Sequence, residues 1–394
     1  DDKSNLQYLC AAGVTFMFLV SLNRELRQTN WFNEKKIKEP DLINYLDLVS
    51  LGTVCDVVPL IGLNRALVKQ GLKIHKFKKN LGLKTLLDIC KIETSPSIYH
   101  LGYMLGPRIN AGGRVGKCSH GAELLLNTNP KKAFQLASEL NQYNKERQML
   151  EEDLLKKILN QTGDYSKDPV IILSGNNWHE GVIGIVAARL KDKFNKPVII
   201  ISIQNNIGKA SARSIVGFDI GSSIIAATQE KILIKGGGHK MAGGFSIDIK
   251  NIEKFKDFIF RKFRNINEDI ASIKPLCLDS VISPTAINLD FYNQVNLLAP
   301  FGSGNPEPKF IIEDVKTING KIVGEKHIKS VLIGLDGSAI KTIAFNAVNN
   351  DLGGFLLTKN NKSFNIAGKL SLNEWRGQSN VEFIIDDISV NKTF

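Results

Sequence analysis

Nine residues at positions 236–244, GGGHKMAGG, combine bare backbone with a histidine and a lysine. Consecutive glycines lack Cβ atoms, so their N–H groups can approach an anion closely and their φ angles can be positive. His239 and Lys240 add side-chain donors beside that backbone. A phosphate is the expected ligand, contacted by Gly237, Gly238, His239 and Lys240. The alternative is a flexible turn with a structural histidine; the two glycine clusters favour the phosphate contact.

A second stretch, LGPRINAGGRVG at positions 105–116, carries two arginines and an asparagine among glycines. Its proline and glycines predict a turn-rich loop rather than a regular helix. The guanidinium groups of Arg108 and Arg114 suit bidentate binding of phosphate oxygens, with Asn110 between them. A contact loop is favoured over a structural loop with surface arginines.

One carboxylate, Asp56, stands among apolar residues in LGTVCDVVPL at positions 51–60. A carboxylate buried there would have to be paired, protonated or bound to a metal, because a bare buried charge is too costly. The alternative is a helix-capping or turn aspartate. The residues alone leave both open.

Residues 168–273 alternate predicted strands and helices. Buried strands are expected at 169–173 and 197–203, with a turn and an apolar helix at 178–189 between them. Residues 209–214, KASARS, predict a short edge strand that presents Ser211 and Arg213. This pattern indicates a small α/β domain with anion-binding character. In it, His179 is expected to be a hydrogen-bonded structural residue.

The flanking segments predict helices before this block and strands after it. Helices are expected at 1–27 and 41–51, and a long helix at 131–161 whose polar middle favours a bridge between two domains. Residues 275–394 predict a small β-barrel of short strands. Trp375 and Arg376 are expected in a turn before the last strand, either stacking on a base or as structural residues.

Composition places the chain among ordinary globular proteins of two or three domains: 394 residues, 43% hydrophobic and 23% charged. It contains neither a membrane-length apolar run nor a signal peptide. Five scattered cysteines without a CxxC pair suit a reducing cytoplasm. The formal charge is +12, yet from position 275 onward there are 11 basic and 12 acidic residues, so the excess lies earlier. A polyanionic partner fits this asymmetry, although a merely basic surface is an alternative.

Seven motifs in order resemble the RecJ family of single-strand-specific DNA exonucleases, within the DHH phosphoesterase superfamily. Three are the stretches at 51–60, 105–116 and 236–244, and the fourth is WHEGVIGIVAAR at 178–189. The last three are APFGSGNPEP at 299–308, GEKHIK at 324–329 and NEWRG at 373–377. The resemblance implies an α/β multidomain fold: the C-terminal part of a DHH domain at 1–130, a connecting helix at 131–161, a DHH-associated domain at 162–273 and an OB-type barrel at 274–394.

The implied activity is removal of mononucleotides from the 5′ end of single-stranded DNA in repair and recombination, by two Mn²⁺ or Mg²⁺ ions. Single-strand-binding protein and a repair helicase are the implied partners. By the same resemblance, Asp56 is a metal ligand, and Ser211 and Arg213 contact the 5′-phosphate. The remaining implied DNA contacts are Arg108, Asn110, Arg114 and the 236–244 loop, with possible OB-domain contacts at Lys326, His327, Lys329, Trp375 and Arg376.

The family's Asp-His-His signature and its preceding Asp-rich motif are absent from these residues, and the first residue is Asp1 rather than Met. We therefore expect a piece of a longer protein, with little or no nuclease activity by itself, because one carboxylate cannot hold two ions. Two alternatives are a catalytically dead remnant that binds single-stranded DNA, and a DHH phosphodiesterase for short oligonucleotides or cyclic dinucleotides. An OB-type domain argues against the latter.

Overall fold

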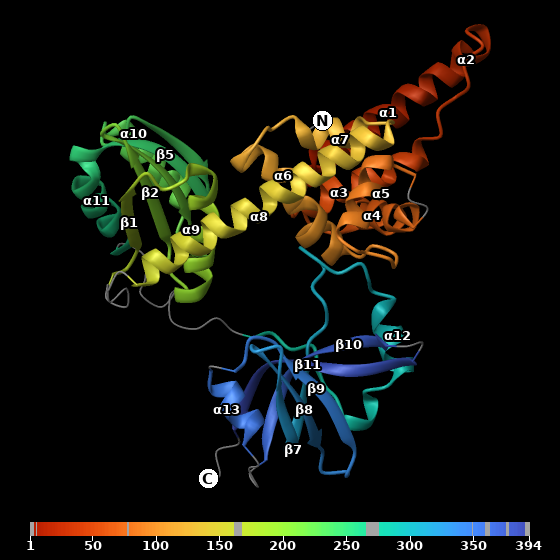
Figure 1. Cartoon of the computed structure of the whole chain (residues 1–394), viewed down its shortest axis with the longest axis vertical. Coiled ribbons are helices and arrows are strands. Elements are labelled where there is room, and N and C mark those ends of the chain that lie inside the picture. Colours follow the sequence, from red (N-terminus) through yellow and green to blue (C-terminus); the bar gives the residue numbers. More distant parts are fainter. Residues whose placement is uncertain are drawn as a thin grey trace. The chain divides into compact units, whose positions relative to one another are not determined.

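The computed structural model describes residues 4, 6–76, 79–160, 168–264, 276–348, 350–358, 363–375 and 378–390. The chain forms two compact units, one of residues 1–77 with 275–394 and one of residues 78–274 (Figure 1). Among the described residues, no helix has the length and apolar character needed to cross a membrane.

The amino-terminal part of the first unit is helical. Cys10 caps its first helix by accepting a hydrogen bond from the Gly13 N–H at 3.4 Å. The helix predicted from residue 1 therefore begins ten residues later. The second predicted helix opens as a 3₁₀ turn, which Asp41 caps through the N–H of Ile43. The helical elements are α1 (Ala11–Gln28), α2 (Trp31–Glu34), the 3₁₀ turn Leu42–Tyr45, α3 (Leu46–Cys55) and α4 (Gly62–His75).

The carboxyl-terminal part of the first unit is the predicted β-barrel. The strand order is β10-β11-β9-β8-β7-β6, and β10 also pairs with β7, which closes the barrel. Its strands are not all short as predicted, since β7 has 14 residues, with an irregularity in its pairing to β8. Two short helices were not predicted. The elements are β6 (Ser280–Val281), α12 (Leu289–Asn296), β7 (Phe310–Val323), β8 (His327–Ile333), β9 (Ala339–Ala344), α13 (Asp351–Leu357), β10 (Phe364–Trp375) and β11 (Gln378–Val390).

The second unit begins with helices that lead into its longest one (Figure 1). They are α5 (Leu81–Ile89), the π-helix His100–Leu105, α6 (Gly106–Val115), α7 (His120–Leu126) and α8 (Pro130–Asn160). The prediction of a turn-rich loop at 105–116 is wrong, because these residues form α6. Pro107 lies at the start of α6, where α6 directly follows the π-helix. Gly112 allows close packing, since a Cβ there would lie 2.4 Å from the Lys117 carbonyl oxygen.

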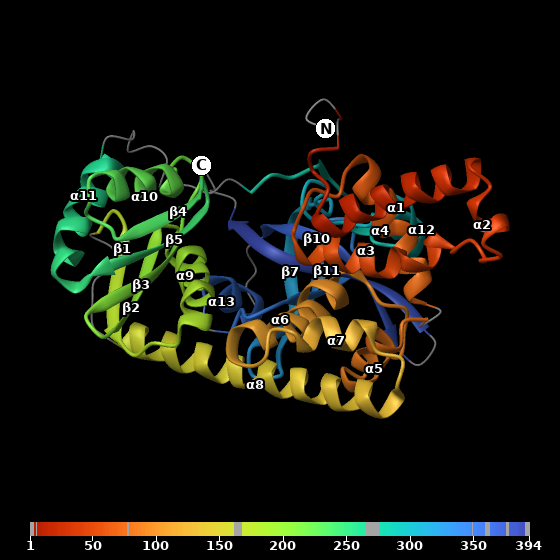
Figure 2. The same cartoon turned by 90° about the horizontal axis from the view of Figure 1, so that it is seen from above.

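The α/β part of the second unit has a five-stranded sheet of order β1-β2-β3-β5-β4. The strands β1 and β2 are parallel, and β3, β5 and β4 continue the sheet antiparallel. Helices α8 and α9 pack on one face, and α10 and α11 pack on the other (Figure 2). The elements are β1 (Ile171–Asn176), α9 (Glu180–Phe194), β2 (Val198–Gln204), β3 (Ile207–Arg213), α10 (Ile220–Gln229), β4 (Lys235–His239), β5 (Ala242–Asp248) and α11 (Ile252–Arg264).

Two predictions in this sheet are wrong. The KASARS strand is not at the edge, because β3 lies between β2 and β5. The stretch 236–244 is not a loop with positive φ angles but the antiparallel hairpin of β4 and β5. Close packing against neighbouring residues requires glycine at some of these positions, whether or not a ligand binds there. A Cβ on Gly243 would lie 2.4 Å from Ile224 Cδ1, and one on Gly221 of α10 would lie 2.8 Å from the His239 backbone.

A close contact between α3 and α4 gives the first prediction. A Cβ on Gly71 would lie 2.2 Å from the Leu46 carbonyl oxygen and 2.5 Å from Ser50 Cβ. We expect Gly71→Ala to destabilise these helices by about 1–3 kcal/mol through overpacking, measured as reduced hydrogen-exchange protection in α3 and α4. The control is Gly354→Ala in α13, where an added Cβ meets nothing within 4 Å. Equal protection in both variants would contradict the expected contact.

A buried histidine in the same helices gives the second prediction. His75 is 2% exposed and its Nε2 lies 3.1 Å from Ser50 Oγ. Burial lowers the pKa of His75 from 6.5 to about 4. The unfolded chain therefore takes up a proton between these values that the folded chain does not, so stability falls as pH drops from about 6.5 to about 4.

Between about pH 6.5 and pH 4, this effect of His75 is expected to lower the free energy of unfolding by about 3 kcal/mol. Asp47, whose pKa burial raises, acts in the opposite direction, so variants are compared. Replacing His75 by Gln should flatten the pH dependence of hydrogen-exchange protection in α4. Replacing the exposed His239 by Gln should leave that dependence as it is. An unchanged slope in His75→Gln would show that His75 does not cause it.

Candidate nucleic-acid interface

One face of the β3–β5–β4 sheet brings together four of the residues predicted to bind phosphate: Ser211, Arg213, Gly237 and His239. Ala210, Ala212 and Phe245 point into the core with α10 and α11. Since side chains alternate along a strand, the residues between them lie on the opposite face. Three cross-strand rows form there: Lys209, Ser246 and Lys235; Ser211, Gly244 and Gly237; Arg213, Ala242 and His239.

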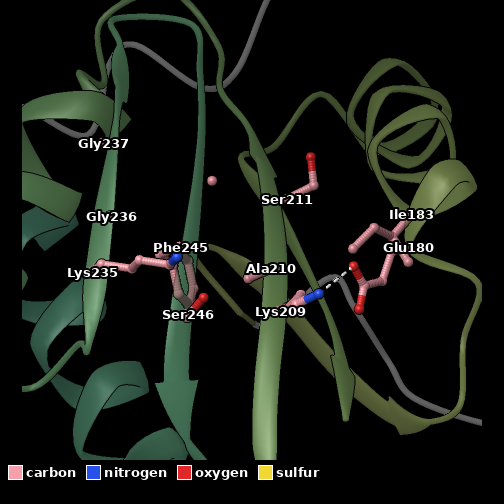
Figure 3. Close-up of a pocket in the computed structure, with 11 residues that line it drawn as sticks. Glu180, Ile183, Lys209, Ala210, Ser211, Lys235, Gly236, Gly237, Phe245 and Ser246 are labelled. Atoms are coloured by element: carbon pink, nitrogen blue, oxygen red, sulfur yellow. Dashed lines mark hydrogen bonds and ion pairs between the residues drawn. The ribbon is translucent and has the colours of Figure 1, made fainter. Parts of the chain in front are cut away.

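The central row leaves an open shelf of backbone. A Cβ on Gly237 would meet nothing within 4 Å, so packing within the protein does not require glycine there. The first two of these rows line a cavity of about 500 Å³. Figure 3 shows Gly236 and Gly237 of β4 on one side of this cavity and Ser211 and Glu180 on the other side. Ligand cavities commonly measure about 300–1,000 Å³, so the space suits a mononucleotide unit.

The amino terminus of α9 borders this cavity. His179 accepts a hydrogen bond from the Gly181 N–H at 3.1 Å and so caps α9, as its predicted structural role requires. Glu180 pairs with Lys209 at 2.8 Å (Figure 3). That pair neutralises a carboxylate which would otherwise repel an anion. One net positive side chain, Lys235, remains exposed on this border.

Arg213 is half-buried on β3 and lacks a carboxylate partner among the residues that the structure describes. Its Nη1 donates to Ser211 Oγ at 3.1 Å and to the Ala212 carbonyl oxygen at 2.8 Å. Burial, and then the charge of Arg114, lower the pKa of Arg213. Gly184 of α9 leaves room for both side chains, since a Cβ there would lie 2.8 Å from Ser211 Oγ. A guanidinium held in this way is ready to bind an anion.

Helix α6 contributes two further arginines. Arg108 Nε donates to Asn141 Oδ1 of α8 at 3.0 Å, and its Nη1 donates to the Met104 carbonyl oxygen at 2.7 Å. Arg114 Nη1 donates to the Gly181 carbonyl oxygen at 3.0 Å and so joins α6 to α9. Asn110 is exposed on the same helix. Neither arginine forms an ion pair with a carboxylate in the described part of the chain.

Sequence reasoning missed Arg147 and Arg189, which join this cluster through the buried Glu151. Arg147 Nη1 lies 2.9 Å from Glu151 Oε2, and Arg189 Nε lies 2.5 Å from Oε1. Burial lowers the pKa of Arg147, and the charges of Arg114, Arg189 and Arg108 lower it further, against the opposing effect of Glu151. The four-residue spacing of Arg147 and Glu151 on a predicted helix was the available signal.

The other predicted contacts are less clearly free for a ligand. Gly238 packs closely within the hairpin, since a Cβ added to it would lie 2.4 Å from the Ala242 carbonyl oxygen. Lys240 is exposed in the turn. In the barrel, Lys326 is exposed, whereas His327 Nδ1 accepts from the Asn346 N–H at 3.0 Å. Lys329 lies 3.5 Å from Glu382. The Trp375 side chain and all of Arg376 lie outside the described residues.

Asp56 belongs to the first unit. It is exposed at the carboxyl end of α3, so the argument from a buried carboxylate does not apply to it. Within the described ranges, no three His, Cys, Asp or Glu side chains are grouped so as to hold a metal ion. A divalent ion needs several oxygen or imidazole ligands. The described residues therefore do not fit a two-ion site by themselves.

Two known domain families match parts of this chain. The DHHA1 domain family matches residues 167–265, and the RecJ OB domain family matches residues 278–387. The single-stranded-DNA-specific exonuclease RecJ of Escherichia coli K12 is 33% identical over 397 residues, covering 96% of this chain and 67% of that protein. The chain belongs to the RecJ family. The RecJ protein of Dickeya dadantii is 32% identical with the same coverage.

Solved RecJ structures share this architecture. RecJ from Thermus thermophilus in complex with Mg²⁺ superposes with a TM-score of 0.76 at 28% identity, over 91% of this chain and 54% of that one. The Mn²⁺ complex gives the same TM-score at 29% identity over 51% of that chain. This chain thus spans about half the length of those RecJ chains. Its fold is part of a DHH domain, the helix α8, the DHHA1 sheet and a C-terminal OB-type barrel.

The glycine shelf gives the third prediction. We expect Gly237→Ala to change stability by less than about 1 kcal/mol, because the added Cβ enters open space. Gly238→Ala should cost about 1–3 kcal/mol, because its Cβ would lie 2.4 Å from the Ala242 carbonyl oxygen. Urea unfolding of each variant, followed by hydrogen exchange of β4 and β5, measures the difference. A Gly237→Ala variant as unstable as Gly238→Ala would contradict the open shelf.

Proposed function

We propose that this chain is part of a 5′→3′ exonuclease that hydrolyses single-stranded DNA to mononucleotides in DNA repair and recombination. The observation that carries the proposal is the sheet face on which Arg213 and Ser211 lie beside the open backbone of Gly237. Guanidinium groups that lack carboxylate partners can bind a phosphate, and so can bare backbone. Both features bind the phosphate whichever base the nucleotide carries. The related exonucleases of Escherichia coli and Dickeya dadantii support the same interpretation.

The residues take the following proposed roles. Ser211 and Arg213 bind the 5′-phosphate, and Gly237 lets the nucleotide approach the sheet. Arg108, Asn110 and Arg114 hold the DNA backbone beside it. Gly238, His239 and Lys240 form the hairpin end of the cleft, and the OB-type barrel adds contacts to the more distant strand at residues such as Lys326. Single-strand-binding protein and a repair helicase are the proposed partners.

Relatives of this chain have been crystallised with Mg²⁺ or Mn²⁺. We propose Asp56 as one ligand of such an ion in an active protein, although the described residues do not assemble a site. The chain as given should therefore bind single-stranded DNA and cut it little or not at all. A catalytically inactive single-strand-binding remnant is the second candidate. A phosphodiesterase for short oligonucleotides is disfavoured by the barrel.

The fourth prediction tests the binding face. We expect Arg213→Ala to weaken binding of a 5′-phosphorylated single strand about 10- to 100-fold, because a charge-assisted hydrogen bond contributes about 1.5–3 kcal/mol. The slope of log affinity against log salt should fall by about 0.7 for each phosphate that the variant no longer binds. Arg261→Ala on α11 is the matched control, since α11 covers the opposite sheet face. Equal effects of the two variants, or a flat salt response, would reject the assigned face.

The same preparation tests catalysis. Nuclease activity with Mn²⁺ is measured on this chain and on a chimera that joins it to the amino-terminal region of the Escherichia coli relative. We expect cutting only by the chimera, and loss of at least about 100-fold in its Asp56→Ala variant, because a missing ligand disturbs the ion. Strand binding without cutting by either protein would favour the binding remnant. Cutting by the isolated chain would contradict the proposed dependence on further ligands.

A further inference from the structure

The carboxylate of Glu151 is the least exposed charged group in the candidate interface. Glu151 lies in the middle of α8 and is 0% exposed. Charged side chains are rarely buried to this extent unless they are paired. None of the roles proposed above uses this carboxylate. As an anion it would repel a phosphate, so its presence among phosphate-binding arginines needs another explanation.

Two arginines from different helices surround this carboxylate. Arg147 of α8 reaches Oε2 at 2.9 Å, and its Nε and Nη2 also donate to Asn144 Oδ1 at 3.2 and 3.0 Å. Arg189 of α9 reaches Oε1 at 2.5 Å. That second contact is short but not aligned as a hydrogen bond, and Oε1 has no other partner among the described residues. Glu151 therefore depends on the charge of Arg189, and the pair ties α9 to α8.

Helix α9 connects this ion pair to the phosphate-binding residues. At its first turn, the Gly181 carbonyl oxygen accepts the hydrogen bond from Arg114. One turn later, Gly184 lies against Ser211 and Arg213, so that an added Cβ would be 2.8 Å and 3.1 Å from their polar atoms. A shift of α9 along α8 would therefore change the separation of Arg114 and Arg213. Arginines from two separate elements converge on one anion only if that separation is maintained.

We propose that Glu151 is a positioning residue: by pairing with Arg189 it fixes α9 on α8, and so holds Arg114 and Arg213 at the spacing that recognises a 5′-phosphate. This inference rests on the proposed function. It assigns Glu151 no contact with DNA. Its carboxylate also offsets part of the mutual repulsion among the arginines of α6, α8, α9 and β3.

Replacing Glu151 by Gln separates this role from simple electrostatics. Gln has nearly the same shape but removes one negative charge from a cationic site. If charge alone mattered, the variant would bind every single strand more tightly and to the same degree. If Glu151 positions the arginines, the preference for a 5′-phosphate over a 5′-hydroxyl end should fall about tenfold, while binding of the 5′-hydroxyl strand stays equal or tightens.

The experiment measures the dissociation constants of the whole chain for one oligonucleotide with either 5′ end. Glu152→Gln, an exposed neighbour on α8, makes the same charge change and should keep the wild-type preference. Glu151→Asp keeps the charge but shortens the side chain by one methylene, and should also lose the preference for a 5′-phosphate. The Asp variant tests the role if circular dichroism shows that Glu151→Gln does not fold.

An unchanged 5′-phosphate preference in a folded Glu151→Gln variant, or in Glu151→Asp if the Gln variant does not fold, would overturn the positioning role. Failure of the proposed function would look different. In that case the wild-type chain itself would not bind the oligonucleotide, or would bind both 5′ ends equally well.

Discussion

Repulsion among closely spaced guanidinium groups is the constraint on which this interface depends. Burial lowers the pKa of Arg147, and the charges of Arg114, Arg189 and Arg108 lower it further against the effect of Glu151. Burial and the charge of Arg114 likewise lower the pKa of Arg213. Within the described part of the chain, Glu151 is the carboxylate that forms ion pairs with this group. The folded chain thus keeps an excess of partly buried positive charge, a costly arrangement that an anion relieves. The helix contacts around α9 are what keep the charges together without that anion.

The sheet also helps to place these residues, through the alternation of side chains along its strands and the register between them. Alternation along β3 sends Ala210 and Ala212 into a core with α10, and so sends Ser211 and Arg213 to the other face. The pairing of β3 with β5 and of β5 with β4 then aligns Ser211 with Gly244 and Gly237. The register of three strands therefore decides which backbone is bare beside the arginine. A shift of β5 by one residue would turn Phe245, which lies in that core, to the open face.

The sequence motifs correctly predicted the family and the barrel, because residue type and order carry those signals locally. They misassigned the conformation of 105–116 and 236–244. Glycine and proline were interpreted as turn formers, whereas Gly116 and Gly243 are small because Tyr143 of α8 and Ile224 of α10 approach them closely. Such contacts arise from distant segments, which a local pattern does not reveal. Glu151 was missed for the same reason, since Arg189 lies 38 positions further along the chain.

The bare shelf also bears on which strands could be accommodated. Gly237 and Gly244 offer the same peptide groups to whatever lies above them, and those groups do not distinguish adenine from thymine or a purine from a pyrimidine. Discrimination between bases needs side chains that read their edges. A nucleotide held at this shelf would be recognised by its sugar and phosphate. Indifference to base identity would then follow from the missing Cβ atoms themselves.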